Sequence, residues 1–174
     1  MRIAVNQADI PTQRVANFFL EQARQEGVAL TAMKLQKLVY IAYGWHLALT
    51  GKKLFDEGIE AWKHGPVVPS LYHEFKHFRG APITAMSVAY DYDSDNDYIP
   101  HVSDEDAEAQ MVLGKVWNIY KRFSGSALRN KTHVEDGPWH RVYDDNRMGV
   151  NLRDEDIAEH YQERIRAYLA AANE

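Results

Sequence analysis

The sequence contains no cysteine. Disulfides, thiolate metal sites and cysteine nucleophiles are therefore excluded, which is compatible with a reducing compartment. No stretch approaches the roughly 20 consecutive apolar residues that span a bilayer. The first residues, MRIAVNQADIPTQRVANFF, also lack the apolar segment of a signal peptide. We therefore expect a cytoplasmic protein without a membrane segment.

Positive charge is scarce as well, because 20 Lys and Arg residues stand against 25 Asp and Glu residues, for a net charge of −5. This balance does not favour a large surface that follows nucleic-acid phosphates, so we do not expect nucleic acid as a partner, although a local basic patch is compatible with it. Nucleophile-elbow, Walker-type and G-x-G-x-x-G motifs are missing too. The sequence thus predicts a protein that is not an enzyme and that carries no cofactor.

Helical spacing of apolar residues dominates the 174 residues, which suit one domain spanning residues 1–174 with its own core. One run covers residues 11–26 and ends at Gly27. A second, capped by Thr31, continues to residue 50 before Gly51 and is apolar on two sides, which predicts a helix at the centre of the domain. Further helices are predicted over residues 68–78 and from Ser103, Ser126 and Asn151. Two of these helices have predicted inward residues. They are Met111, Trp117, Tyr120 and Phe123 in the helix from Ser103, and Ile157, Tyr161, Ile165, Tyr168 and Leu169 in the helix from Asn151.

Two segments have strand character. Residues 58–63 alternate apolar and polar side chains before Gly65-Pro66, which we interpret as a chain breaker. Residues 80–102 form an exposed acidic connection in which residues 83–92 and 98–102 are the expected arms of a hairpin. The predicted fold class is therefore mainly α: a compact helical bundle around the helix of residues 31–50, with a short strand or hairpin near residues 58–63 and a hairpin within residues 83–102.

Residues 73–77 spell H-E-x-x-H, the zinc-protease signature, and Gly80 matches its longer form. Position 83, however, is Ile in place of the third ligand. On a helical wheel, His73 and His77 lie opposite the apolar face, and no sheet precedes them to hold a substrate. A zinc metallopeptidase built on His73, Glu74 and His77 is therefore the least favoured hypothesis, and we predict no metal site.

The acidic run also resembles a calcium loop, with aspartates at positions 91, 93, 95 and 97. The loop requires glycine at its sixth position and a bidentate Glu at its twelfth, where this sequence has Asn96 and Val102. We therefore predict a charged loop without a dedicated calcium site.

Two linked stretches are distinctive: residues 33–38 (MKLQKL) leading to residues 44–46 (GWH), and residues 60–72 (EAWKHGPVVPSLY). Together they resemble the Panacea domain family, which includes SocA-like antitoxins and phage-associated GepA-type proteins. The resemblance extends to residues 132–133 (TH) and 138–139 (PW) and covers residues 11–143. The sequence departs from the family pattern at residues 134–137 (VEDG) and in the acidic connection of residues 80–102.

The resemblance implies a mainly α-helical antitoxin of a two-gene toxin–antitoxin system, which binds a toxin protein directly, with different members paired to unrelated toxins. The cognate toxin is therefore the expected partner, and we expect a homo-oligomer or a hetero-oligomer. A regulatory adaptor or DNA-binding autorepressor is the alternative function. Its local support is a basic cluster of Lys63, His64, His73, Lys76, His77 and Arg79.

The expected partner-binding surface combines aromatic side chains, positive charge and a rigid turn, as protein interfaces do. Trp62 alternates away from Ile59 and Ala61, so it faces either the partner or a neighbouring helix. Lys34 and Lys37 are either surface charges with stems along the core, or they reach an acidic partner or a buried carboxylate such as Glu60. The candidate partner-binding residues are Lys34, Lys37, Glu60, Trp62, Lys63, His64, Pro66 and Tyr72.

A second group of residues in the same motifs is expected to be structural. Trp45 belongs in the core, and His46 is expected to be a hydrogen-bonded core histidine. Gly65 and Pro69 shape the backbone, with Pro69 in the first turn of a helix. His133 and Trp139 complete this group.

Overall fold

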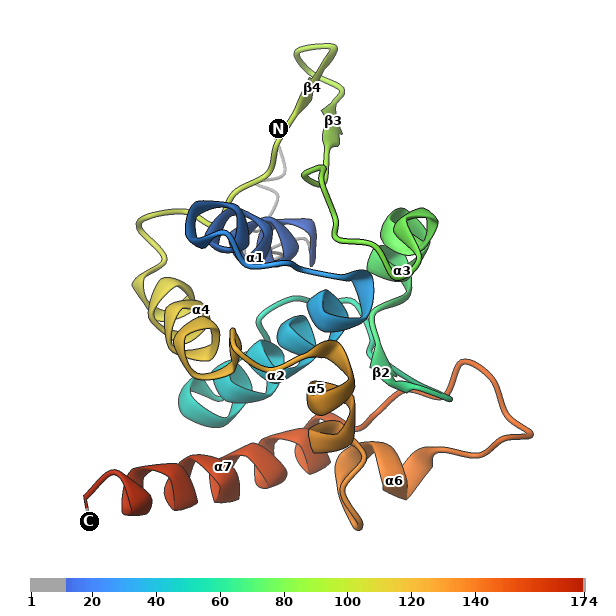
Figure 1. Cartoon of the computed structure of the whole chain (residues 1–174), viewed down its shortest axis with the longest axis vertical. Coiled ribbons are helices and arrows are strands. Elements are labelled where there is room, and N and C mark those ends of the chain that lie inside the picture. The colour runs from blue at the N-terminus through green and yellow to red at the C-terminus, as the bar shows by residue number, and fades with distance from the viewer. Residues whose placement is uncertain (1–11, 174) are drawn as a thin grey trace, which may run out of the picture.

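The computed structural model describes residues 12–173, so Pro11, expected at the start of the first helix, lies outside the described residues. Within this range the chain is mainly α-helical, as predicted (Figure 1). The helices are α1 (Thr12–Glu26), α2 (Ala32–Thr50), α3 (Pro69–Phe75), the 3-10 helix η1 (Lys76–Phe78), α4 (Ala107–Tyr120), α5 (Gly125–Thr132), α6 (Pro138–Val142) and α7 (Asp154–Ala171). The strands are β1 (Glu60–Trp62), β2 (Gly65–Val67), β3 (Ala89–Asp91) and β4 (Asn96–Tyr98).

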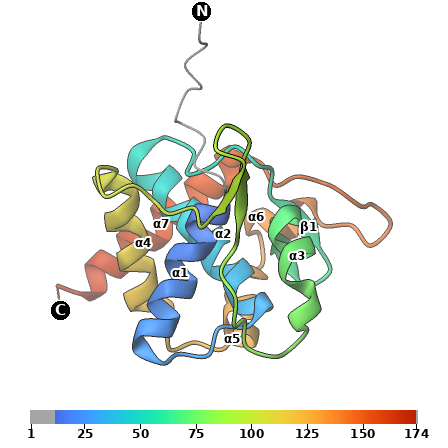
Figure 2. The same cartoon turned by 90° about the horizontal axis from the view of Figure 1, so that it is seen from above.

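Helix α2 is the central element, which confirms the prediction. Every residue from 34 to 47 is buried, because α1, α4, α5 and α7 all pack against it. Its ends follow the capping signals: the Thr31 side chain accepts a hydrogen bond from the Lys34 amide, and Gly51 has a left-handed conformation (φ 69°). Figure 1 and Figure 2 both show α3 and α4 on opposite sides of α2.

Helix α4 begins later than Ser103, where the sequence places it. Asp106 is the N-cap and accepts a hydrogen bond from the Ala109 amide at 3.1 Å. The Ser103 hydroxyl instead accepts from the Glu105 amide in the preceding turn. The prediction is wrong by about one turn because both residues are good caps, and the structure uses the second one.

The predicted inward residues are mostly buried, but three are not. Met111, Tyr168 and Leu169 are 47%, 47% and 55% exposed. In Figure 1 the C-terminal turns of α7 run past the end of α2, so the apolar face of α7 is longer than the surface that covers it. Trp117 and Ile157, by contrast, are 1% exposed and lie in the core.

The segment after α2 forms a hairpin, and here Gly65-Pro66 begins strand β2, which corrects its interpretation as a breaker. Strand β1 pairs antiparallel with β2, with Trp62 opposite Gly65. Gly65 has φ 104°, a conformation that favours glycine and allows the tight turn. Helix α3 then starts with Pro69 in its first turn, as predicted.

The acidic connection forms a second hairpin, but its arms are shorter than predicted. Strands β3 and β4 pair with Asp91 opposite Asn96, so Asp93 and Asp95 lie in the turn, while Asp91 and Asp97 lie in the strands. Asp91 accepts hydrogen bonds from the Asp93 amide and the Ser94 hydroxyl, which occupies its carboxylate with local turn contacts. The base of this hairpin is held by the buried Asn17.

None of the helices described is both long and apolar enough to cross a membrane.

Candidate functional site

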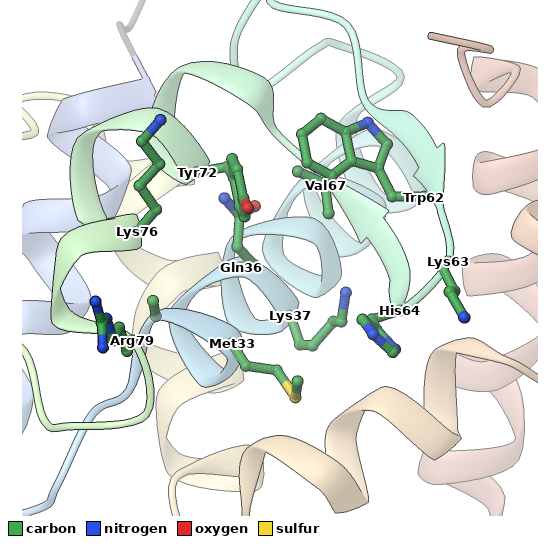
Figure 3. A pocket seen from close by; sticks show the side chains of 11 residues that line it. Met33, Gln36, Lys37, Trp62, Lys63, His64, Val67, Tyr72, Lys76 and Arg79 are labelled. Atoms are coloured by element: carbon green, nitrogen blue, oxygen red, sulfur yellow. The ribbon is translucent and has the colours of Figure 1, made fainter. Parts of the chain in front are cut away.

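A groove of about 340 Å³ lies between the N-terminal half of α2, the hairpin β1–β2, and α3 with η1 (Figure 3). Its apolar lining comes from all three elements: Met33 on α2, Trp62 and Val67 on the hairpin, and Tyr72 on α3. The groove therefore lies within the strand–turn–helix region that the sequence predicts as the partner-binding surface.

The aromatic wall of the groove is Trp62 packed on Tyr72, with ring centroids 4.7 Å apart in an edge-to-face arrangement. The Trp62 indole donates a hydrogen bond to Glu60 at 2.7 Å, while its backbone carbonyl accepts one from the Trp139 indole at 2.8 Å. Trp62 is half-buried and Tyr72 is 40% exposed. Trp62 therefore packs on a neighbouring helix, as one of the two alternatives predicts, and its contact with a partner stays a prediction.

Positive charge surrounds the groove. Lys63 and His64 at the hairpin turn, and Lys76 and Arg79 after α3, are exposed and line it, whereas no Asp or Glu among residues 12–173 does. None of these four side chains forms an ion pair with another described residue. Arg79 also has φ 54°, which is uncommon for a non-glycine residue and often marks a functional segment. A basic groove thus lies in a chain of net charge −5.

Lys37 corrects the sequence-based expectation, because it is neither a surface charge nor a partner of Glu60. It is 2% exposed, and its ammonium donates a hydrogen bond to the Pro66 carbonyl at 2.8 Å. Figure 3 shows its amine pointing toward the hairpin beside His64. Burial, and then repulsion from Arg129, lowers the pKa of Lys37 to about 7.

Lys34 is corrected in the same way, and it lies apart from the groove. Its ammonium donates a hydrogen bond to the Lys121 carbonyl at 2.5 Å, and the residue is 6% exposed. Burial lowers the pKa of Lys34 as well. The structure therefore brings Lys37 to the groove and places Lys34 in the packing between α2 and the end of α4.

Pro66, a predicted partner-binding residue, is buried, and its carbonyl accepts the hydrogen bond from Lys37. Gly65 beside it is required by space as well as by its backbone angle. A Cβ atom there would lie 2.8 Å from both the Lys37 Nζ and the His133 Cε1.

The residues predicted to be structural are packed as expected. Trp45 and Trp139 are 4% and 8% exposed. His46 is 5% exposed, and its Nδ1 lies 2.9 Å from the Lys52 carbonyl. The His133 ring packs on Trp139 in a tilted arrangement, with centroids 4.0 Å apart, and its Nδ1 donates a hydrogen bond to the Arg129 carbonyl at 2.7 Å, since a carbonyl can only accept. Burial lowers the pKa of His133.

The H-E-x-x-H segment does not form one continuous α-helix. Helix α3 ends at Phe75 and η1 begins at Lys76, with His73 and His77 both exposed. Among residues 12–173, no three His, Asp or Glu side chains are grouped so that they could hold a metal ion.

Six groove residues lie outside the predicted partner-binding set: Ala32, Met33 and Gln36 on α2, Val67 in β2, and Lys76 and Arg79, which the sequence places only in the basic cluster. Gln36 accepts a hydrogen bond from the Val68 amide and donates one to the Val68 carbonyl, at 2.9 and 3.0 Å, which fixes the hairpin–α3 junction to α2. The available signal is helical spacing, because positions 33, 36 and 37 share one side of α2.

The fold and the groove together define a mainly α-helical protein with a basic, aromatic groove. The family model described as "Antitoxin SocA-like, Panacea domain" matches residues 35–140, which include most of α2, the hairpin, α3 and Trp139. Antitoxin SocA from Caulobacter vibrioides (strain NA1000 / CB15N) is 30% identical over 143 residues, which are 82% of this chain and 74% of that protein. No solved structure matches the chain. The chain belongs to the SocA-like Panacea family, as its motifs predict.

Proposed function

We propose that this protein is an antitoxin that neutralises a cognate toxin by direct binding in the cytoplasm, and that the groove is its toxin-binding surface. The family membership supports the antitoxin role. The observation that carries the choice of surface is the aromatic pair of Trp62 and Tyr72, still accessible to solvent, beside cations without ion-pair partners among the described residues. Aromatic and basic side chains of this kind are the usual energetic anchors of protein interfaces.

The rigidity of the groove supports the same proposal. Three buried hydrogen-bonding groups hold the hairpin: Gln36 at the backbone of Val68, Lys37 at the Pro66 carbonyl, and the Trp139 indole at the Trp62 carbonyl. Ordering one long side chain at an interface costs about 0.5–1.5 kcal/mol. Because these hydrogen bonds already fix the backbone of the hairpin, less conformational entropy is lost when this surface binds a partner.

The test is the Trp62→Ala variant, assayed with the product of the adjacent gene for complex formation and for relief of toxicity. As an interface anchor, Trp62 should contribute about 2 kcal/mol, so the variant should bind roughly 30-fold more weakly. Thermal unfolding on the same preparation should change little, because the side chain is half-buried and the Trp139 hydrogen bond uses the backbone carbonyl. A fully core tryptophan would instead lose about 3–5 kcal/mol of stability.

Trp62→Phe is the matched control, because it keeps a ring against Tyr72 and removes the hydrogen bond to Glu60. It should retain most of the affinity. Full affinity in Trp62→Ala would place the interface elsewhere, and absence of any complex with the adjacent gene product would contradict the antitoxin proposal itself.

The unpaired cations also favour a second candidate, a regulatory adaptor or DNA-binding autorepressor. Binding to the protein's own promoter that weakens steeply with salt and depends on Lys76 and Arg79 would support it. The net charge of −5 predicts weak binding in that assay.

A further inference from the structure

Resting on the proposed toxin-binding function, we propose that the groove takes an acidic segment of the toxin in which one large apolar side chain is flanked by carboxylates. The proposal names the chemistry of the bound segment from the lining of the groove. Its size, about 340 Å³, is at the lower end of ligand clefts, which run from roughly 300 to 1,000 Å³. It therefore suits an inserted side chain with its neighbours better than a whole folded element.

The centre of the groove accounts for the apolar side chain. Trp62, Val67 and Tyr72 lie near one another there, Met33 lines the same groove from α2, and the lining is mainly apolar (Figure 3). Met33 is 39% exposed and unbranched, so it can adjust to the shape of an inserted group. Tyr72 and Trp62 supply fixed aromatic surface, because their rings already pack on each other.

The edge of the groove accounts for the carboxylates. Lys63 projects from the hairpin turn, and Lys76 and Arg79 project from the segment after α3, so cations flank the apolar centre on two sides. Negative groups on both sides of one apolar residue complement this arrangement. No Asp or Glu of residues 12–173 lines the groove, so no acidic side chain lining it neutralises these cations.

Lys37 adds a buried donor to the same site. An ammonium group has three N–H donors, and within residues 12–173 the Lys37 amine has the Pro66 carbonyl as its hydrogen-bond acceptor. A buried amine with unused donors gains a hydrogen bond when a carboxylate approaches, and the negative charge also favours its protonated form, which makes the bond charge-assisted. The side chain is 2% exposed and lines the groove, so it would meet the innermost acidic group of the segment.

An acidic protein segment fits these features better than a nucleic acid does. A phosphate-binding surface needs cations spaced along a track, whereas here they surround an apolar centre. The net charge of −5 also opposes long-range attraction of a polyanion such as DNA. A short acidic segment is attracted by the nearby cations of the groove and is affected less than a long polyanion by the net negative charge of the chain.

The experiment uses a library of random octapeptides displayed on phage and panned against the full chain. Three proteins are compared: the wild type, the Lys76→Glu/Arg79→Glu variant, and the Lys115→Glu/Arg166→Glu variant. The last carries the same change of charge on exposed residues of α4 and α7, away from α3. Circular dichroism and thermal unfolding of all three establish that each is folded before panning.

The proposal predicts that wild type and the α4/α7 control enrich the same peptides, with one Phe, Trp or Leu flanked by Asp or Glu. A synthetic copy of an enriched peptide should bind the Lys76→Glu/Arg79→Glu variant at least about tenfold more weakly, and Trp62→Ala should weaken it as well. No enrichment, enrichment of neutral or basic peptides, or equal binding to both charge variants would overturn the acidic segment. So would displacement of the enriched peptide by a random DNA oligonucleotide in preference to an acidic competitor.

The result separates this proposal from the antitoxin function. A toxin complex that depends on Trp62 but not on Lys76 and Arg79 would overturn the acidic segment and leave the antitoxin role intact. Acidic peptides that bind in the groove, with no complex formed by the adjacent gene product, would keep the site and contradict its use for that toxin.

Discussion

Replacing the buried Lys37 by Met should change how the stability of the protein depends on pH. In the folded state the pKa of Lys37 is about 7, whereas the ordinary value is 10.5. Between these two values the unfolded chain binds more protons than the folded one, so folding gains stability as the pH rises. This gain is complete above about pH 10.5 and is lost as the pH falls through about 7.

At about 1.4 kcal/mol for each pKa unit, the full contribution is on the order of 5 kcal/mol. Met has a similar length and no charge. The stability of Lys37→Met therefore lacks this dependence on pH, and the variant does not bury a charged amine at low pH as the wild type does. It also leaves the Pro66 carbonyl without its donor, at a cost of about 1–3 kcal/mol. We therefore expect the variant to be more stable than the wild type at pH 6, and its advantage to shrink or reverse by pH 10.

The assay is urea unfolding of wild type, Lys37→Met and Lys115→Met at pH 6, 8 and 10. Arg129 and His133 also face the Lys37 amine, and Lys37→Met removes the repulsion by which Lys37 helps to lower the pKa of His133. The difference between pH 8 and pH 10, above the ordinary His pKa of 6.5, therefore reports on Lys37 itself. Lys115 is exposed on α4, so its variant should follow the wild type at every pH. If the free energies of unfolding of wild type and Lys37→Met changed in parallel with pH, the description of Lys37 as a buried, weakly basic lysine would be refuted.

Three further substitutions test the packing that positions α2. Gly44→Ala should destabilise the protein by about 3 kcal/mol or more, because a Cβ atom there would overlap the Tyr161 ring; Ala in an open helix would instead stabilise by about 1 kcal/mol, so the sign of the change in melting temperature decides. Asn17→Ala removes buried hydrogen bonds to the Ser87 backbone and the Pro100 carbonyl and should cost about 2–4 kcal/mol in urea unfolding; a loss within error would contradict this anchoring. Thr31→Ala removes the α2 N-cap and should cost about 1 kcal/mol, whereas Thr31→Ser should cost little.

The central helix could be predicted because its signals are local. Thr31 and Gly51 mark its ends through contacts within one turn, and its two apolar sides follow from spacing alone. Helical spacing shows which residues share a face, but not how far a neighbouring helix covers that face. This is why Tyr168 and Leu169 belong to the periodic pattern of α7 and are nevertheless exposed.

The site could be predicted only in part, for a related reason. The strand alternation around Trp62 locates strand β1 correctly, whereas Gly65-Pro66 looks like a chain breaker in the sequence and begins β2 in the structure. The burial of Lys37 could not be predicted, because its hydrogen-bond acceptor is the carbonyl of Pro66, 29 residues away, and becomes available only when β2 forms. Met33 and Arg79 likewise meet in one groove only through the packing of α2 against α3 and η1.

The most direct test of the central claim, that the toxin binds in the groove, is site-specific photocrosslinking. p-Benzoylphenylalanine is placed at position 33 in the groove, or at position 169 on α7, where Leu169 is 55% exposed, and each protein is co-expressed with the product of the adjacent gene. We predict a covalent toxin adduct from position 33 and none from position 169. An adduct from position 169 with none from position 33 would contradict the account.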